Sequence, residues 1–224
     1  MDVFDLLVDE AWPAPNRVTA GEWVFRHAAG VTKRANSVLA LGEGSIEAAE
    51  RFYAGLGLPC VFSIGGGAPE GLDGELAARG YRLVDPTLVM TAPAAYGTPE
   101  VTVEDIPSRE WMDTWWSVDG GRHAGGAEWG ERILTGVPAG YASVGAVAVG
   151  RGVRQGEWLG VYCMAVRPEE RRKGLGRAIL RGLRAWGAGR NAYLLVTEAN
   201  AAARALYERE GFTVAGRYHY RVKQ

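Results

Sequence analysis

Residues 166–177 read Val-Arg-Pro-Glu-Glu-Arg-Arg-Lys-Gly-Leu-Gly-Arg. This stretch follows an apolar run that predicts a buried strand at 158–166, and it opens a predicted helix at 177–188. Gly174 and Gly176 allow the backbone to turn tightly and to approach a ligand with no side chain in the way. The first amide N–H groups of a helix lack intrahelical partners and favour anions. The sequence therefore predicts a phosphate-binding turn, to which positive charge is added by Arg171, Arg172, Lys173 and Arg177.

Two other phosphate-binding motifs do not fit the glycines. A dinucleotide-binding turn requires a third glycine where this chain has Ile179. A Walker loop requires Gly-Lys followed by Ser or Thr, which is absent both here and from residues 66–71. Taken alone, the turn leaves open a charged helix start that binds no ligand.

A second stretch, residues 200–212, reads Asn-Ala-Ala-Ala-Arg-Ala-Leu-Tyr-Glu-Arg-Glu-Gly-Phe. The pattern Arg-x-x-Gly-x-Gly after a strand, followed by Asn-x-x-Ala-x-x-Leu-Tyr-x-x-x-Gly-Phe, resembles the GNAT (Gcn5-related) N-acetyltransferase superfamily. The resemblance covers roughly residues 100–224. It implies an α/β (α+β) GNAT fold, with a mixed central sheet flanked by helices, and acetyl-CoA as co-substrate. It says little about the acceptor.

The resemblance also implies roles for particular residues. The strand before the turn splays from its neighbour in this family, so that its backbone binds the pantetheine arm, and Tyr207 protonates the departing thiolate. Two other roles stay open: Asn200 can act as a helix N-cap, and Tyr207 can be a core aromatic residue. The expected cofactor-binding residues are Met164, Ala165, Val166, Arg171, Arg172, Lys173, Gly174, Leu175, Gly176, Arg177, Asn200 and Ala203.

The general base cannot be assigned. Several family members carry a glutamate on the strand before the turn, and the matching position here is Gly160. Glu157 lies three residues earlier and has the opposite strand parity. A water relay and three residues of the segment expected to line the acceptor pocket remain alternatives: Asp119, His123 and Glu128.

The first half resembles a decayed copy of the second. A shift of 132 residues places Gly42 and Gly44 on the two glycines of the turn, and a shift of 131 residues places Gly80 on Gly211. We interpret residues 1–95 as a degenerate, partial GNAT-like domain without cofactor, and residues 96–224 as the catalytic domain. The cations of the second turn are replaced by Leu39 and Leu41, Glu43 adds a negative charge, and Leu76 stands for Tyr207.

Hydrophobic periodicity predicts the elements in outline. A short amphipathic helix is expected within residues 1–20, and separate strands at 81–84 and 87–91. The second half is expected to end in two strands, at 213–215 and 218–222. Its predicted order is β-α-α-β-β-β-α-β-α-β-β.

Composition limits the partners. The chain has 224 residues, of which 47% are hydrophobic and 23% charged, and a formal net charge of −1. This near-neutral charge disfavours nucleic acid and anionic membranes as partners. Cys60 and Cys163 lie in apolar runs without ligand spacing, so we expect reduced thiols and no metal. Acidic residues near the start disfavour a signal peptide. A cytoplasmic monomer or homodimer is expected.

The expected function is transfer of an acetyl group from acetyl-CoA to a small-molecule or peptide amine, by direct attack in a ternary complex. The alternative is a non-catalytic acyl-CoA-binding regulatory or scaffold module. A histone or nucleic-acid-associated enzyme is disfavoured by the near-zero net charge. Antibiotic, polyamine, amino-acid and peptide amines all remain open as acceptors.

Overall fold

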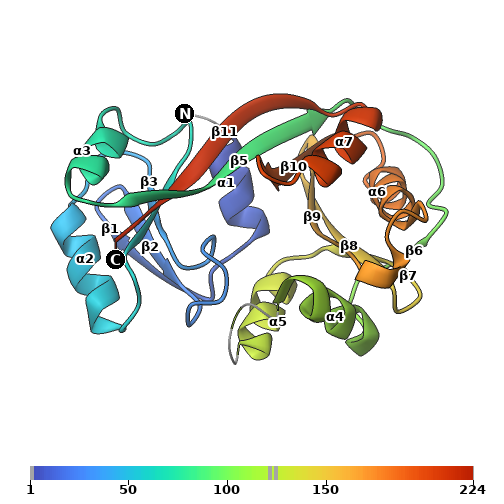
Figure 1. The fold of residues 1–224 in the computed structure, drawn as a ribbon, viewed down its shortest axis with the longest axis horizontal. Coiled ribbons are helices and arrows are strands. Elements are labelled where there is room, and N and C mark those ends of the chain that lie inside the picture. The colour runs from blue at the N-terminus through green and yellow to red at the C-terminus, as the bar shows by residue number, and fades with distance from the viewer. Residues whose placement is uncertain (1–2, 121–122, 124–125, 224) are drawn as a thin grey trace.

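The computed structural model describes residues 3–120, 123 and 126–223. Its strands form one mixed sheet of eleven strands, in the order β1-β2-β3-β4-β11-β5-β10-β9-β8-β7-β6, with helices on its faces (Figure 1). The α/β fold class predicted from the sequence is confirmed. No described helix is long and apolar enough to span a membrane.

The elements of the first half begin with a helix and end with a long strand. They are α1 Val3–Ala11, β1 Asn16–Ala20, β2 Trp23–His27, β3 Val38–Ala40, α2 Ile46–Gly55, β4 Val61–Ile64, α3 Leu72–Ala78 and β5 Arg82–Ala92. Those of the second half include a π-helical turn, η1, and a 3₁₀ turn, η2. They are β6 Thr102–Glu104, α4 Arg109–Trp115, η1 Trp116–Gly120, α5 Ala127–Thr135, β7 Gly140–Val144, β8 Ala148–Gln155, β9 Trp158–Val166, η2 Pro168–Glu170, α6 Leu175–Trp186, β10 Asn191–Thr197, α7 Ala201–Arg209 and β11 Thr213–Val222.

The two halves exchange their last strands. β5 lies between β10 and β11 and is antiparallel to both, while β11 also pairs with β4 of the first half. Figure 1 shows β5 and β11 running together across the molecule. The final strand of the second half, β11, therefore lies next to β4 of the first half, and the final strand of the first half, β5, lies next to β10 of the second half.

The order of elements is the same on both sides of this exchange. In the first half, β2 pairs antiparallel with β1 and β3, and β3 pairs in parallel with β4. In the second half, β8 pairs antiparallel with β7 and β9, and β9 pairs in parallel with β10. A helix follows β3 and β4 in the first half, and β9 and β10 in the second. This repeated topology supports the interpretation of residues 1–95 as a GNAT-like copy, which stays a prediction.

Three expectations about strands were wrong. β5 is one strand, not two. Asp85 has a φ of 50° and is followed by Pro86, and the strand passes these two residues because its pairing with β11 shifts register between Tyr218 and Tyr220. β11 is also one strand, since β4 and β5 pair with it on either side and an irregularity between Val214 and Gly216 absorbs the break. β1 was not predicted, because its residues are mostly exposed.

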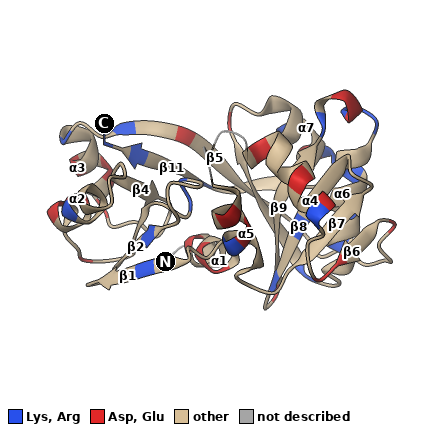
Figure 2. Ribbon diagram, turned by 90° about the horizontal axis from the view of Figure 1, so that it is seen from below, with Lys and Arg blue, Asp and Glu red and all other residues tan. Residues whose placement is uncertain are grey.

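Helices cover both faces of the second half's sheet. Trp111 and Trp115 of α4 pack with α1 and α5 residues on one face. Ile179 and Leu183 of α6 pack with Tyr207 of α7 on the other face. Basic and acidic residues are interspersed over both halves (Figure 2).

The strand exchange predicts that the second half cannot fold by itself. A fragment of residues 96–224 would lack β5 and would leave the facing edges of β10 and β11 unpaired. We expect no cooperative thermal transition for this fragment by circular dichroism, and recovery of one when residues 1–95 are co-expressed. A fragment that unfolds cooperatively by itself near the full chain's Tm would contradict this arrangement.

Candidate functional site

The parallel strands β9 and β10 separate part of the way along their length. Their pairing runs from Trp158 with Asn191 to Val161 with Leu194, although β9 continues to Val166. Cys163 has φ of 55° and lies where the pairing of β9 with β8 shifts register. Beyond this bulge, β9 pairs with β8 but not with β10. The strand therefore presents backbone groups along residues 164–166 to the opening between the two strands.

The predicted phosphate turn follows directly. Arg172 and Gly174 both have positive φ, 63° and 82°, and Gly174 precedes α6 without a side-chain cap. Successive amides in such a conformation form a concave anion-binding site. A Cβ placed on Gly176 would lie 3.5 Å from Leu206 Cδ2 and 3.7 Å from Val166 Cγ2. The turn, the end of β9 and α7 therefore meet at one place.

The cationic side chains of the turn differ in their partners. Arg171, Arg172 and Lys173 are exposed; Arg171 Nε donates to the Val166 carbonyl at 3.2 Å, and Lys173 pairs with Glu170 at 2.9 Å. These contacts lie at the surface and contribute little stability. The three side chains can therefore reorient toward an anion at the turn.

Arg177 has a different partner. Its Nε lies 2.6 Å from Glu210, which also binds Arg181 at 2.7 Å. Burial alone would raise the pKa of Glu210, but the two arginines hold this pKa below its usual value. Arg177 therefore offers its backbone amide to the turn, while its guanidinium is engaged elsewhere.

Asn200 acts as the N-cap of α7. Its Oδ1 accepts a hydrogen bond from the backbone N–H of Ala203 at 3.1 Å, which is one of the two roles that the sequence left open. Leu175 and Ala203 pack against the same apolar cluster as Met164 and Val166. Contacts of these residues with a cofactor stay a prediction.

Tyr207 is buried within that cluster. It is 6% exposed and lies against Phe212, with ring centroids 6.0 Å apart. Burial raises the pKa of the Tyr207 phenol to about 12. Among the described residues, none forms a hydrogen bond with its hydroxyl. The side chain is thus a protonated, desolvated phenol near the end of β9.

The place of the missing glutamate is filled by tyrosines. A Cβ on Gly160 would lie 2.6 Å from the Tyr162 ring and 2.7 Å from the Tyr193 hydroxyl. The two tyrosine hydroxyls are 2.7 Å apart, and that of Tyr193 donates to Gln155 at 2.7 Å. A longer side chain at 160 has no room, which explains why glycine stands there.

The other candidate bases lie at different distances from the bulge. Glu157 is exposed in the turn before β9, at the end opposite the opening, and Glu128 is exposed on α5. His123 packs against Trp116, with centroids 6.5 Å apart. Asp119 lies in η1, close enough to the bulge for its charge to act on Cys163. Burial raises the pKa of the Cys163 thiol, and the negative charge of Asp119 raises this pKa further. Residues 121, 122, 124 and 125 of the predicted loop 119–126 lie outside the described residues.

Both cysteines are free thiols, as predicted. Cys60 is buried on the first-half side, and burial raises its pKa to about 11. The sequence did not indicate that Cys163 would form the bulge of β9, because a positive φ at a non-glycine residue has no local signature.

The first half's turn is blocked by its own side chains. The Glu22 carboxylate accepts a hydrogen bond from the backbone N–H of Glu43 at 2.8 Å. Trp23 Nε1 donates to the Gly42 carbonyl at 2.7 Å, and its ring lies directly against Gly44. An internal carboxylate and an indole thus occupy the positions that match the candidate anion site of the second half.

Similar proteins were found by sequence and by structure. Residues 8–221 match the family model described as the C-terminal part of the probable histone acetyltransferase Rv0428c. The chain is 33% identical to the uncharacterized N-acetyltransferase YobR of Bacillus subtilis, over 97% of this chain and 96% of YobR.

Solved structures share the fold. A GCN5-related N-acetyltransferase from Kribbella flavida superposes with a TM-score of 0.66 at 14% identity, covering 100% of this chain and 96% of that one. A putative GNAT acetyltransferase from Novosphingobium aromaticivorans gives 0.59 at 18% identity, covering 96% and 95%. With the splayed strands, the glycine turn and the match along nearly the whole chain, these likenesses show that the chain belongs to the GNAT family of N-acetyltransferases.

Proposed function

We propose that this protein transfers an acetyl group from acetyl-CoA to an amine by direct attack in a ternary complex. The observation that carries the proposal is the convergence of the splayed end of β9, the uncapped start of α6 and Tyr207. The opening offers backbone groups to an extended amide-containing arm, and the turn offers amides to a pyrophosphate. These two features match the two polar parts of acetyl-CoA.

Different residues of the chain would bind acetyl-CoA and transfer the proton. Backbone groups of 164–166 would orient the pantetheine, and amides of 172–177 would hold the pyrophosphate, with exposed Arg171, Arg172 and Lys173 adding charge. The acceptor nitrogen forms a bond with the acetyl carbon while the carbon–sulfur bond breaks. Tyr207 gives its phenolic proton to the departing sulfur, and the acceptor's excess proton leaves to a base that we do not assign.

Direct transfer is favoured over a covalent acetyl-enzyme. The obvious nucleophile, Cys163, lies at the bulge, but burial raises its pKa and keeps the thiol protonated. Two basic side chains act on it in the opposite direction, Arg151 and Arg34, and the net pKa shift is still upward. The buried Tyr207 with no hydrogen-bond partner among the described residues favours a catalytic protein over a non-catalytic CoA-binding module.

The proposal predicts one acetyl-CoA per chain, which Gly174→Asp abolishes. The substitution puts a side chain at φ of 82° and a carboxylate beside the pyrophosphate. A like-charge pair about 4 Å apart costs about 4 kcal/mol at an effective dielectric of about 20, or about three decades in Kd. Isothermal titration calorimetry should give a stoichiometry of one for the native chain.

Gly156→Asp is the matched control. Gly156 also has positive φ, with open space around it, but lies in the remote turn between β8 and β9. It should bind acetyl-CoA normally. Wild-type affinity in Gly174→Asp, or a stoichiometry of two, would argue against the proposed site.

Tyr207→Phe should retain acetyl-CoA affinity and lose turnover. The substitution removes the acid and leaves the aromatic packing against Phe212, so Tm and Kd should change little. Loss of general acid catalysis lowers kcat by about 10²-fold, measured by release of the CoA thiol. An unchanged kcat would mean that Tyr207 only packs, or that a step other than chemistry limits the rate.

A further inference from the structure

The loop between β2 and β3, residues 28–37, has a strained and well-supported conformation. Ala29 and Thr32 have positive φ, 47° and 58°, which non-glycine residues rarely adopt. The buried Asn36 side chain holds the loop: Oδ1 accepts from two of its backbone N–H groups, and Nδ2 donates to two of its carbonyls, at 2.7–2.8 Å. The four hydrogen bonds of Asn36 therefore hold the loop in one conformation.

The side chain that the loop presents is Arg34. Its guanidinium carbon lies 5.0 Å from the Trp12 ring centroid and 5.6 Å from that of Tyr162. Rings at these distances leave N–H donors at the edge of the guanidinium for other partners. Nη2 donates to the Tyr218 hydroxyl at 3.3 Å, whereas the buried Nε has no partner among the described residues.

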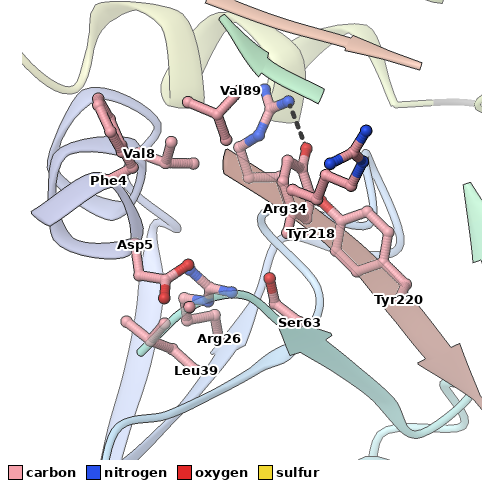
Figure 3. Close-up of a pocket in the computed structure, with 12 residues that line it drawn as sticks. Phe4, Asp5, Val8, Arg26, Arg34, Leu39, Ser63, Val89, Tyr218 and Tyr220 are labelled. Carbon is pink, nitrogen blue, oxygen red and sulfur yellow. Dashed lines mark hydrogen bonds between the residues drawn. The ribbon is translucent and has the colours of Figure 1, made fainter. Parts of the chain in front are cut away.

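A small cavity of about 20 Å³ lies beside this guanidinium, between α1, β3, β4, β5 and β11 (Figure 3). Its walls include three arginines. Arg26 pairs with Asp9 at 2.8 Å and Arg217 with Glu198 at 3.3 Å. Within the described part of the chain, no carboxylate lies within ion-pair distance of Arg34. Asp5, also on the wall, accepts from the Gly67 backbone N–H at 2.7 Å.

This cation lies on the side of β9 where an acceptor would approach. Tyr162, which Arg34 contacts, immediately precedes the bulge at Cys163. In the same loop, Val31 packs directly against Gly126, at the start of α5. Ala28, Val31 and Ala35 belong to the same apolar cluster as Trp115 and Tyr162. The first half thus supplies part of the wall on the acceptor side.

We propose that Arg34 binds a carboxylate of the acceptor, so that the acceptor is a small amine that also carries a carboxylate, such as a free amino acid. The inference rests on the proposed acetyl transfer. The two terminal nitrogens of a guanidinium match the two oxygens of a carboxylate. The cavity holds a group close in size to one water molecule, which suits the end of a carboxylate better than a tetrahedral phosphate. The positive charge of Arg34, which has no carboxylate within ion-pair distance in the described part of the chain, disfavours a lysine-rich histone tail.

Matched amine pairs test the proposal on the full chain. L-lysine is compared with cadaverine, and L-phenylalanine with phenethylamine, through kcat/KM for release of the CoA thiol. The native enzyme should prefer the carboxylated member by about 10²-fold, the effect of a charge-assisted hydrogen bond. Arg34→Gln should remove this preference by slowing the carboxylated substrates alone. Lys33→Gln, which removes the neighbouring exposed charge on the same loop, should behave as the native enzyme.

Several outcomes would overturn the proposal. These are equal rates for both members of every pair, a preference for a lysine-rich peptide that Arg34→Gln leaves unchanged, or no turnover of any carboxylated amine. If Arg34→Gln lowers Tm, the comparison of kcat/KM for the paired amines on the native enzyme still tests whether the acceptor carries a carboxylate. Calorimetry with acetyl-CoA on the same preparation separates the two hypotheses: native protein that binds acetyl-CoA but fails the amine comparison loses only the carboxylate assignment.

Discussion

The exchange of β5 and β11 is the constraint on which the rest of the structure depends. Each strand is the last of its own half, and each pairs antiparallel with a strand of the other half. This exchange closes the edge that β10 would otherwise expose, and it joins both halves in one sheet. It also brings the loop between β2 and β3 onto the α4 and α5 side of β9. The first half can in this way form a wall of the candidate site in the second half.

The second feature is an interruption of pairing rather than a set of side chains. β9 leaves β10 after Val161, and Cys163 adopts a positive φ. Backbone groups that a parallel sheet would satisfy internally then become available, and the uncapped amides of α6 continue the same polar surface. The first half has a matching turn, but Glu22 and Trp23 already occupy it. The two turns therefore differ in two side chains, Glu22 and Trp23, that pack onto the first turn, and in the basic residues that only the second turn carries.

Local patterns carried enough information to predict much of this fold and candidate site. Gly174, Gly176, Asn200 and Tyr207 lie within 34 residues of one another, and the helix and strand between them follow from hydrophobic periodicity. The strand exchange could not be predicted, because the residues of β5 and β11 indicate a strand at each place but do not show which other strands they pair with. Arg34 was missed for a similar reason: its contacts with Tyr162 and Tyr218 join segments more than 120 residues apart. Nothing near position 160 in the sequence reveals that Tyr193 occupies the space of a side chain there.

The central claim is that the splayed end of β9 and the start of α6 together bind acetyl-CoA, and that the first half does not. A crystal structure of the full chain grown with acetyl-CoA tests this most directly. The account predicts one molecule per chain, with its pyrophosphate on the amides of residues 172–177 and its pantetheine hydrogen-bonded to residues 164–166. Density at the first-half turn around Gly42, or a cofactor bound away from the opening between β9 and β10, would contradict it.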